Sequence, residues 1–154
     1  MEVRGGCGYI EEWPDARVLR DAHLGSIWEG TSNVVALDVL RADSREGALE
    51  ALRAHVRGLA GGAPALPEAL AALDRAVALA REAAGEGGGS LVRQAASALY
   101  NATSAAVMAW EAGRLGDPRR LALARMVMAH RVLPRDPLAA QPEAEGLEAV
   151  LAAG

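Results

Sequence analysis

Apolar residues recur at intervals of three and four through most of the chain, and glycines and prolines separate the segments that carry this pattern. The clearest example is formed by Leu49, Leu52, Val56 and Leu59. This spacing places apolar side chains on one face of an α-helix. Because Phe is absent and aromatic residues make up only 3% of the chain, any core must consist mainly of Ala, Leu and Val. The sequence therefore predicts an all-α fold in which amphipathic helices pack as an antiparallel bundle.

Four such helices are expected in the larger part of the chain. They are predicted to begin near residues 43, 67, 90 and 117. Residues 43–46 have the form of a capping box, with Asp43 in the place of Ser or Thr. Ser90 follows a glycine-rich loop and is expected to cap the third helix, while Asp117 and Pro118 open the fourth.

The composition divides the chain into three parts. Residues 1–42 form a motif segment, residues 43–136 form the helical bundle, and residues 137–154 form a loose tail that contains Pro and Glu. Within the first part, a short helix is expected to start at Pro14 and to be interrupted at residues 25–26.

Length, charge and cysteine content exclude several classes of protein. The chain has 154 residues, about one domain, and a formal net charge of −4, so as a whole it is not expected to attract nucleic acid. A single cysteine, Cys7, excludes an internal disulfide, and no metal site is indicated by the widely separated His23, His55 and His130. With neither a signal peptide nor a long apolar run in the sequence, we expect a cytoplasmic protein that does not enter a membrane.

The segment around Glu29 carries the candidate chemistry. Glu29 lies between Trp28 and Gly30, and Thr31 or Ser32 then caps a predicted helix. Gly30 lets another group approach the backbone closely, and a helix start is a favourable position for an anion. A carboxylate buried beside an indole ring has a raised pKa, which suits a general base. The simpler alternative is that Glu29 only complements the helix dipole.

The order of the motifs is more specific than any one of them. Gly-Gly-x-Gly-Tyr-x-x-Glu at residues 5–12 is followed by Pro14, by Arg-Asp-Ala at residues 20–22 and by Trp-Glu-Gly-Thr at residues 28–31. This series, over residues 5–42, resembles the C-terminal helical domain of flavin-dependent acyl-CoA dehydrogenases. The Trp before the Glu, where Tyr is usual, and the long helical extension are similar to the AidB-like, adaptive-response branch of that family.

The resemblance implies specific roles. Glu29 would remove the α-proton of an acyl-CoA thioester while the β-hydride passes to FAD, and Trp28 and Gly30 would line the substrate site. The implied cofactor contacts are Gly5, Gly6, Gly30, Thr31 and Asn33. Of these, the first two would approach the flavin of a neighbouring subunit, which implies a homo-oligomer. Asn33 stands near a position where Gln is commoner. Arg20 and Asp21 would form structural ion pairs.

The resemblance also implies what accompanies this segment in that family. Domains that precede the motif supply most of the flavin site and the CoA channel. The chain is therefore expected to correspond to the C-terminal part of such an enzyme, and to have no dehydrogenase activity by itself.

A second hypothesis concerns duplex DNA, with which the AidB-like branch is associated through its helical extension. The basic residues of the later helices are Arg114, Arg119, Arg120, Arg125, Arg131 and Arg135. Arginines neutralise phosphates, although the negative net charge and the absence of base-reading amides there argue against this interpretation. A third possibility is a helical scaffold in which Glu29 is vestigial.

Overall fold

The computed structural model describes residues 2–28, 30–61, 66–134, 138 and 147–151. Its α-helices are α1 (Gly6–Tyr9), α2 (Asp15–Trp28), α3 (Ser32–Glu46), α4 (Ala48–Ala60), α5 (Pro67–Ala84), α6 (Val92–Leu115), α7 (Pro118–Val127) and α8 (Leu147–Leu151). Short helical turns, η1 (Glu2–Arg4), η2 (Gly88–Leu91) and the π-helical η3 (Met128–Val132), accompany them. The described residues contain no strand, so the predicted all-α class is confirmed.

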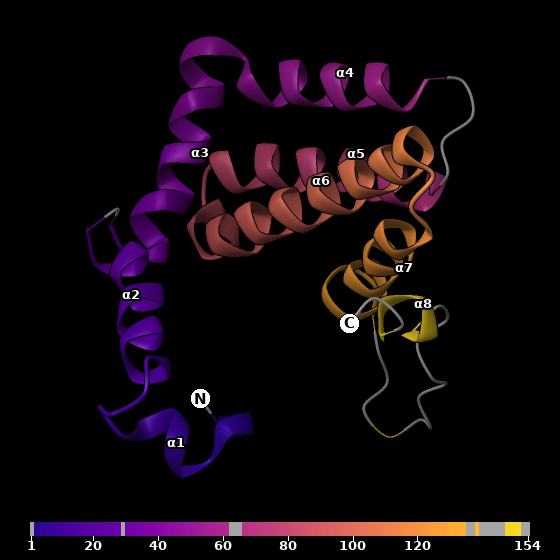
Figure 1. Ribbon diagram of the computed structural model, residues 1–154. Helices are drawn as coiled ribbons and strands as arrows, with labels where there is room; N and C mark the ends of the chain where they lie inside the picture. Colours follow the sequence, from indigo (N-terminus) through magenta and orange to yellow (C-terminus); the bar gives the residue numbers. More distant parts are fainter. Residues whose placement is uncertain (1, 29, 62–65, 135–137, 139–146, 152–154) are drawn as a thin grey trace.

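The bundle is organised around α6. This helix packs most extensively against α5 and α7, and it also contacts α3 and α4. Figure 1 shows α5 and α6 running side by side, with α4 lying above them and α7 below the far end of α6. In the part of the chain that the structure describes, no helix is long and apolar enough to cross a bilayer.

Small side chains fill much of the interface between these helices. The buried alanines of α6 are Ala95, Ala102, Ala105, Ala106, Ala109 and Ala112. The largest fully buried side chains are Leu73 and Val77, both on α5. The core is therefore built from Ala, Leu and Val, as the composition predicts, with Met128 as an addition.

Two predicted helix boundaries are wrong. The expected helix start at residues 43–46 is the last turn of α3, which ends at Gly47 in the left-handed conformation (φ 64°), and α4 begins one residue later. The expected interruption at residues 25–26 does not occur, because α2 continues through Gly25 to Trp28. A glycine inside a helix costs only about 1 kcal/mol relative to alanine, which the rest of a helix can offset.

The other boundaries lie close to their predicted positions. α5 begins at Pro67, and Asp117 caps α7 by accepting a hydrogen bond from the backbone N–H of Arg119. The third predicted helix, α6, begins at Val92, after the 3-10 turn that contains Ser90. Ser90 is therefore not its cap, since Leu91 occupies that position.

The first part of the chain packs much less closely than the bundle. Among the described residues up to Glu46, only Gly8, Ala16 and Ala36 are buried. Figure 1 shows α1 and α2 extending from the lower end of α3, away from α4, α5 and α6. We call the segment from η1 to the end of α2, residues 2–28, the arm.

Candidate functional site

The candidate site lies where the arm joins α3. Trp28 is the last residue of α2, and Ser32 is the first residue of α3. Gly30, between them, has φ 94°, a backbone conformation that L side chains rarely adopt, and an added Cβ would lie 3.3 Å from Val34 Cγ1. The positive φ therefore favours glycine at this position, and an added Cβ would also press against the Val34 side chain. Glu29, the candidate base, lies outside the described residues.

The first turn of α3 presents free backbone donors. Thr31 is its N-cap residue and is exposed, and its carbonyl accepts the first helical hydrogen bond from Val35 N at 3.1 Å. The Thr31 side chain makes no capping hydrogen bond, so the expected N-cap position is confirmed without the expected bond. A helix N-terminus with uncapped N–H groups and the positive end of its dipole favours an anion.

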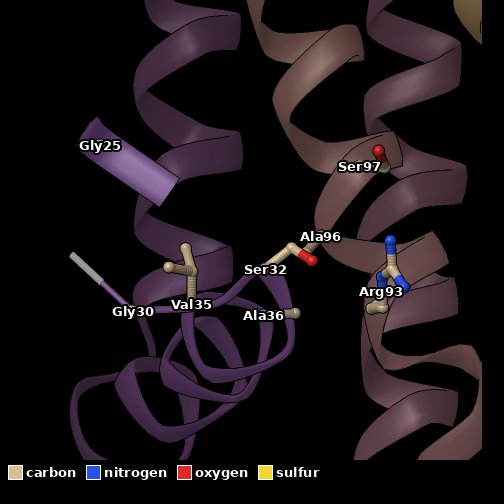
Figure 2. A pocket seen from close by; sticks show the side chains of 8 residues that line it. All are labelled: Gly25, Gly30, Ser32, Val35, Ala36, Arg93, Ala96 and Ser97. Carbon is tan, nitrogen blue, oxygen red and sulfur yellow. The ribbon is translucent and has the colours of Figure 1, made fainter. Parts of the chain in front are cut away.

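A cavity of about 380 Å³ adjoins this helix start. It is lined by Gly25, Gly30, Ser32, Val35, Ala36, Arg93, Ala96 and Ser97. Figure 2 shows the Ser32 hydroxyl directed toward α6, the helix that carries Arg93 and Ser97. Arg93 forms no ion pair with any residue that the structure describes, so its charge is available at the cavity.

The sequence motifs do not indicate Arg93 or Ser97. Both residues lie on a helix far along the chain, and only the packing of α3 against α6 brings them to the cavity. A sequence signal for such a pairing is absent, because one arginine on an amphipathic helix resembles any solvated surface charge.

The predicted cofactor-contacting residues fall into two groups. Gly30, Thr31 and Asn33 lie together at the start of α3, where Asn33 is exposed. Gly5 (φ 57°) and Gly6 lie at α1, beyond the opposite end of α2 (Figure 1). Because a 14-residue helix is about 21 Å long, the two groups cannot form one compact site within a single chain.

The arm carries the ion pairs expected of Arg20 and Asp21. Arg20 Nη2 donates a hydrogen bond to Glu11 Oε2 at 3.0 Å, and this hydrogen bonding holds the pKa of the Glu11 carboxyl below its ordinary value. Asp21 Oδ2 lies 3.6 Å from Arg17 Nε, one helical turn away. Both predicted residues therefore take part in ion pairs, Asp21 within α2 and Arg20 with Glu11, which precedes α2. Trp28, the predicted substrate contact, is 74% exposed.

The arginines of the DNA hypothesis differ in their surroundings. Arg119 Nε donates to Asp117 Oδ1 at 3.1 Å, and this side-chain hydrogen bond lowers the pKa of Asp117. Arg120 is paired with Glu111 on α6. The exposed members of the set are Arg114, Arg119, Arg125 and Arg131. Arg135 lies outside the described residues.

Comparison with known proteins finds a family match that covers the arm and the start of α3. Residues 1–43 match the C-terminal domain of acyl-CoA dehydrogenases. This match covers the arm, the turn at Gly30 and most of α3, and it ends before α4 begins. No significant match was found among solved structures.

Three relatives agree with this assignment. The chain is 47% identical over 62 residues to acyl-CoA dehydrogenase family member 11 of Caenorhabditis elegans, a match that covers 40% of this chain and 10% of that protein. It is 54% identical over 41 residues to the putative acyl-CoA dehydrogenase AidB of Escherichia coli, covering 27% and 8% of the two chains. It is 47% identical over 34 residues to the mitochondrial short/branched chain specific acyl-CoA dehydrogenase of Rattus norvegicus, covering 22% and 8%. The chain thus spans a tenth or less of the length of these relatives.

Proposed function

We propose that this chain is the C-terminal part of an FAD-dependent acyl-CoA dehydrogenase of the AidB-like branch, with Glu29 as the α-proton base. The observation that carries this proposal is the match of residues 1–43, which includes the glycine turn before α3. The expected substrate is an acyl-CoA, which loses hydrogens from Cα and Cβ.

The helix start fits the phosphate part of a dinucleotide. Gly30 keeps the turn free of a side chain, the uncapped first turn of α3 offers N–H donors, and Arg93 adds a positive charge at the same cavity. Thr31 and Asn33 are exposed on this turn and are the side chains that would reach the cofactor. A flavin bound there would supply the acceptor for the hydride that leaves Cβ of the substrate.

The role of Glu29 follows from its chemistry and its neighbours in the sequence. A carboxylate oxygen accepts the α-proton only when the thioester carbonyl is polarised by hydrogen-bond donors, since an α-proton is otherwise too weakly acidic. Trp28 and Gly30 flank it, so that an aromatic face and an open backbone border the reacting carbon in this proposal.

The separation of the two glycine groups supports a site shared between subunits. Gly5 and Gly6 lie beyond the far end of α2 from Thr31, and both are exposed with open space where a Cβ would be. In a homo-oligomer, these glycines would approach the flavin held by another subunit.

The size of the protein in its native source tests the first part of the proposal. An antibody raised to the bundle is expected to detect a band several times larger than 16.0 kDa. A band at 16.0 kDa would contradict it. The purified 154-residue chain, given acyl-CoA and an electron acceptor, is expected to show no turnover.

The proposed role of Glu29 as the α-proton base is tested in the longer protein with flavin bound. Glu29→Gln is expected to lower the rate of acyl-CoA oxidation by about 100-fold or more, with the flavin absorbance unchanged. Glu46→Gln, at the exposed end of α3, is the matched control and should leave the rate unchanged. Equal rates for Glu29→Gln and wild type would exclude Glu29 as the base.

The second candidate function is the binding of duplex DNA by the arginines from Arg114 onward. Its support is weaker, because Arg119 and Arg120 already pair with Asp117 and Glu111. A phosphate would have to displace these carboxylates. The scaffold alternative, with Glu29 vestigial, predicts no effect of the Glu29 substitution.

A further inference from the structure

The cavity between α3 and α6 is bordered by polar side chains whose donors are unused. Arg93 and Ser97 are four residues apart, so they lie on one face of α6, and both are exposed. Across the cavity, the Ser32 hydroxyl of α3 is directed toward α6 (Figure 2). Among the residues that the structure describes, none of these three side chains forms a hydrogen bond or an ion pair.

The charges and donors around the cavity favour an anion with many oxygens. Arg93 is charged, and none of the eight lining residues is acidic. The first turn of α3 adds backbone N–H groups, since the Thr31 side chain caps none of them. A guanidinium, two hydroxyls and these N–H groups offer more donors than the oxygens of one carboxylate can accept. A pyrophosphate, which carries oxygens on both of its phosphorus atoms, matches this set of donors better.

The volume of the cavity limits how much of a ligand it can enclose. At about 380 Å³ it lies near the lower end of the range for small-molecule sites, roughly 300–1,000 Å³. Gly30, Ala36 and Ala96 line it, and their small size keeps it open. A nucleotide would therefore place its pyrophosphate here and leave its larger groups outside the cavity.

We propose that Arg93 and Ser97 of α6, with Ser32 of α3, bind a pyrophosphate, and that the 154-residue chain does so by itself. The nature of the ligand rests on the proposed function, because FAD and CoA both carry a pyrophosphate. The Arg93 guanidinium would donate parallel hydrogen bonds to oxygens of one phosphate. Since α6 lies beyond residues 1–43, which match the family, the bundle contributes part of the binding site.

Isothermal titration calorimetry of the full chain with sodium pyrophosphate at low ionic strength tests the proposal. Wild type is expected to bind with a Kd of about 1 mM or below. Arg93→Gln is expected to weaken binding by about 10-fold or more, because a charge-assisted pair of hydrogen bonds is lost. Arg93→Lys should have an intermediate affinity, since an ammonium keeps the charge but not the parallel donors. Ser97→Ala should weaken binding by about 3-fold, through the loss of one donor.

Arg75→Gln is the matched control. Arg75 is also exposed and forms no ion pair with any described residue, but it lies on α5 and does not line the cavity. This variant loses the same charge as Arg93→Gln and should bind pyrophosphate as wild type does. Far-UV circular dichroism should show equal helix content in all variants. No binding by wild type at about 10 mM pyrophosphate, or equal affinities for Arg93→Gln and Arg75→Gln, would overturn the proposal.

Titrations with FAD and with CoA distinguish the two sources of the pyrophosphate. If Arg93→Gln weakens the binding of FAD and not of CoA, the cavity holds the cofactor. The reverse result would support the pyrophosphate site and contradict the placement of the cofactor at α3. Unchanged affinities for both ligands would overturn the proposal. A longer native protein that contains no flavin would contradict the proposed enzyme function, whereas binding of pyrophosphate through Arg93 would still stand.

Discussion

The carboxylate of Asp43, in the last turn of α3, accepts a hydrogen bond from the backbone N–H of Leu49, in the first turn of α4, at 3.0 Å. The backbone carbonyl of the same residue accepts a hydrogen bond from Gly47 N at 2.8 Å. Asp43 therefore ends one helix with its main chain and caps the next with its side chain. The relationship fixes the bend between α3 and α4, and with it the direction in which α3 leaves the bundle.

Removal of this cap should destabilise the protein. We expect Asp43→Ala to lower the free energy of unfolding by about 1 kcal/mol, because an N–H of the first turn of α4 loses its acceptor. Urea unfolding followed by far-UV circular dichroism measures the change. Asp43→Asn keeps an acceptor oxygen and should retain most of the stability. An equal loss in both variants would assign the effect to charge instead of capping.

The loop between α5 and α6 has one position at which a side chain cannot be accommodated. A Cβ at Gly88 would lie 2.6 Å from the carbonyl oxygen of Ala83 and would also collide with that of Glu82. We expect Gly88→Ala to lower the free energy of unfolding by about 1–3 kcal/mol, since both contacts are with backbone. Gly89→Ala is the control, because its Cβ would meet nothing within 4 Å. Equal unfolding midpoints for the two variants would contradict the loop geometry.

Glu50 links α4 to α5 and should make stability depend on pH. Its carboxylate accepts hydrogen bonds from Arg53 Nη2 at 2.7 Å and from Arg81 Nη2 at 3.1 Å. The bond from Arg53 is the main reason that the pKa of Glu50 lies below its ordinary value of 4.5. A carboxyl whose pKa is lower when folded stabilises the protein above pH 4.5, and this contribution is lost as the pH falls through the folded value.

The corresponding variant is Glu50→Gln. Its melting temperature should be below that of wild type at about pH 7, and the difference should be smaller at about pH 3, because protonation of the wild-type carboxyl increases as the pH falls. The effect at neutral pH should be small, because the side chain is exposed. A difference that stays the same at both pH values would show that the ion pairs do not cause it.

Duplex DNA is expected not to be retarded by the chain in a low-salt electrophoretic assay. The physical reason is that Arg119 and Arg120 already pair with carboxylates, which a phosphate would have to displace. Retardation that disappears in Arg119→Glu/Arg120→Glu would support the DNA hypothesis instead.

Much of the fold follows from local patterns in the sequence. The absence of Phe and the spacing of Leu and Val predict a helical bundle with a small-residue core, and Pro67 and Asp117 mark helix starts correctly. The junction of α3 and α4 was not predictable in the same way. Asp43 has the sequence form of an N-cap, but its cap bond reaches over Gly47 from the preceding helix, which depends on a left-handed glycine.

The residues of the candidate site likewise include some that could be predicted from the sequence and some that could not. Gly30 and Thr31 belong to a contiguous motif, so their place at the start of α3 could be predicted. Arg93 could not, because it reaches the cavity only through the packing of α6 against α3. Contacts between residues this far apart in sequence depend on the whole packing arrangement, which a periodic pattern does not specify.

The distribution of aromatic rings has a consequence for spectroscopy. Trp13 and Trp28 belong to the arm, Trp110 is half-buried on α6, and no aromatic side chain of the protein is fully buried. Intrinsic fluorescence therefore reports mainly on the arm, whereas far-UV ellipticity is dominated by the longer helices of the bundle. Heating curves recorded with these two signals will separate if the arm loosens first, and their coincidence would show that arm and bundle unfold together.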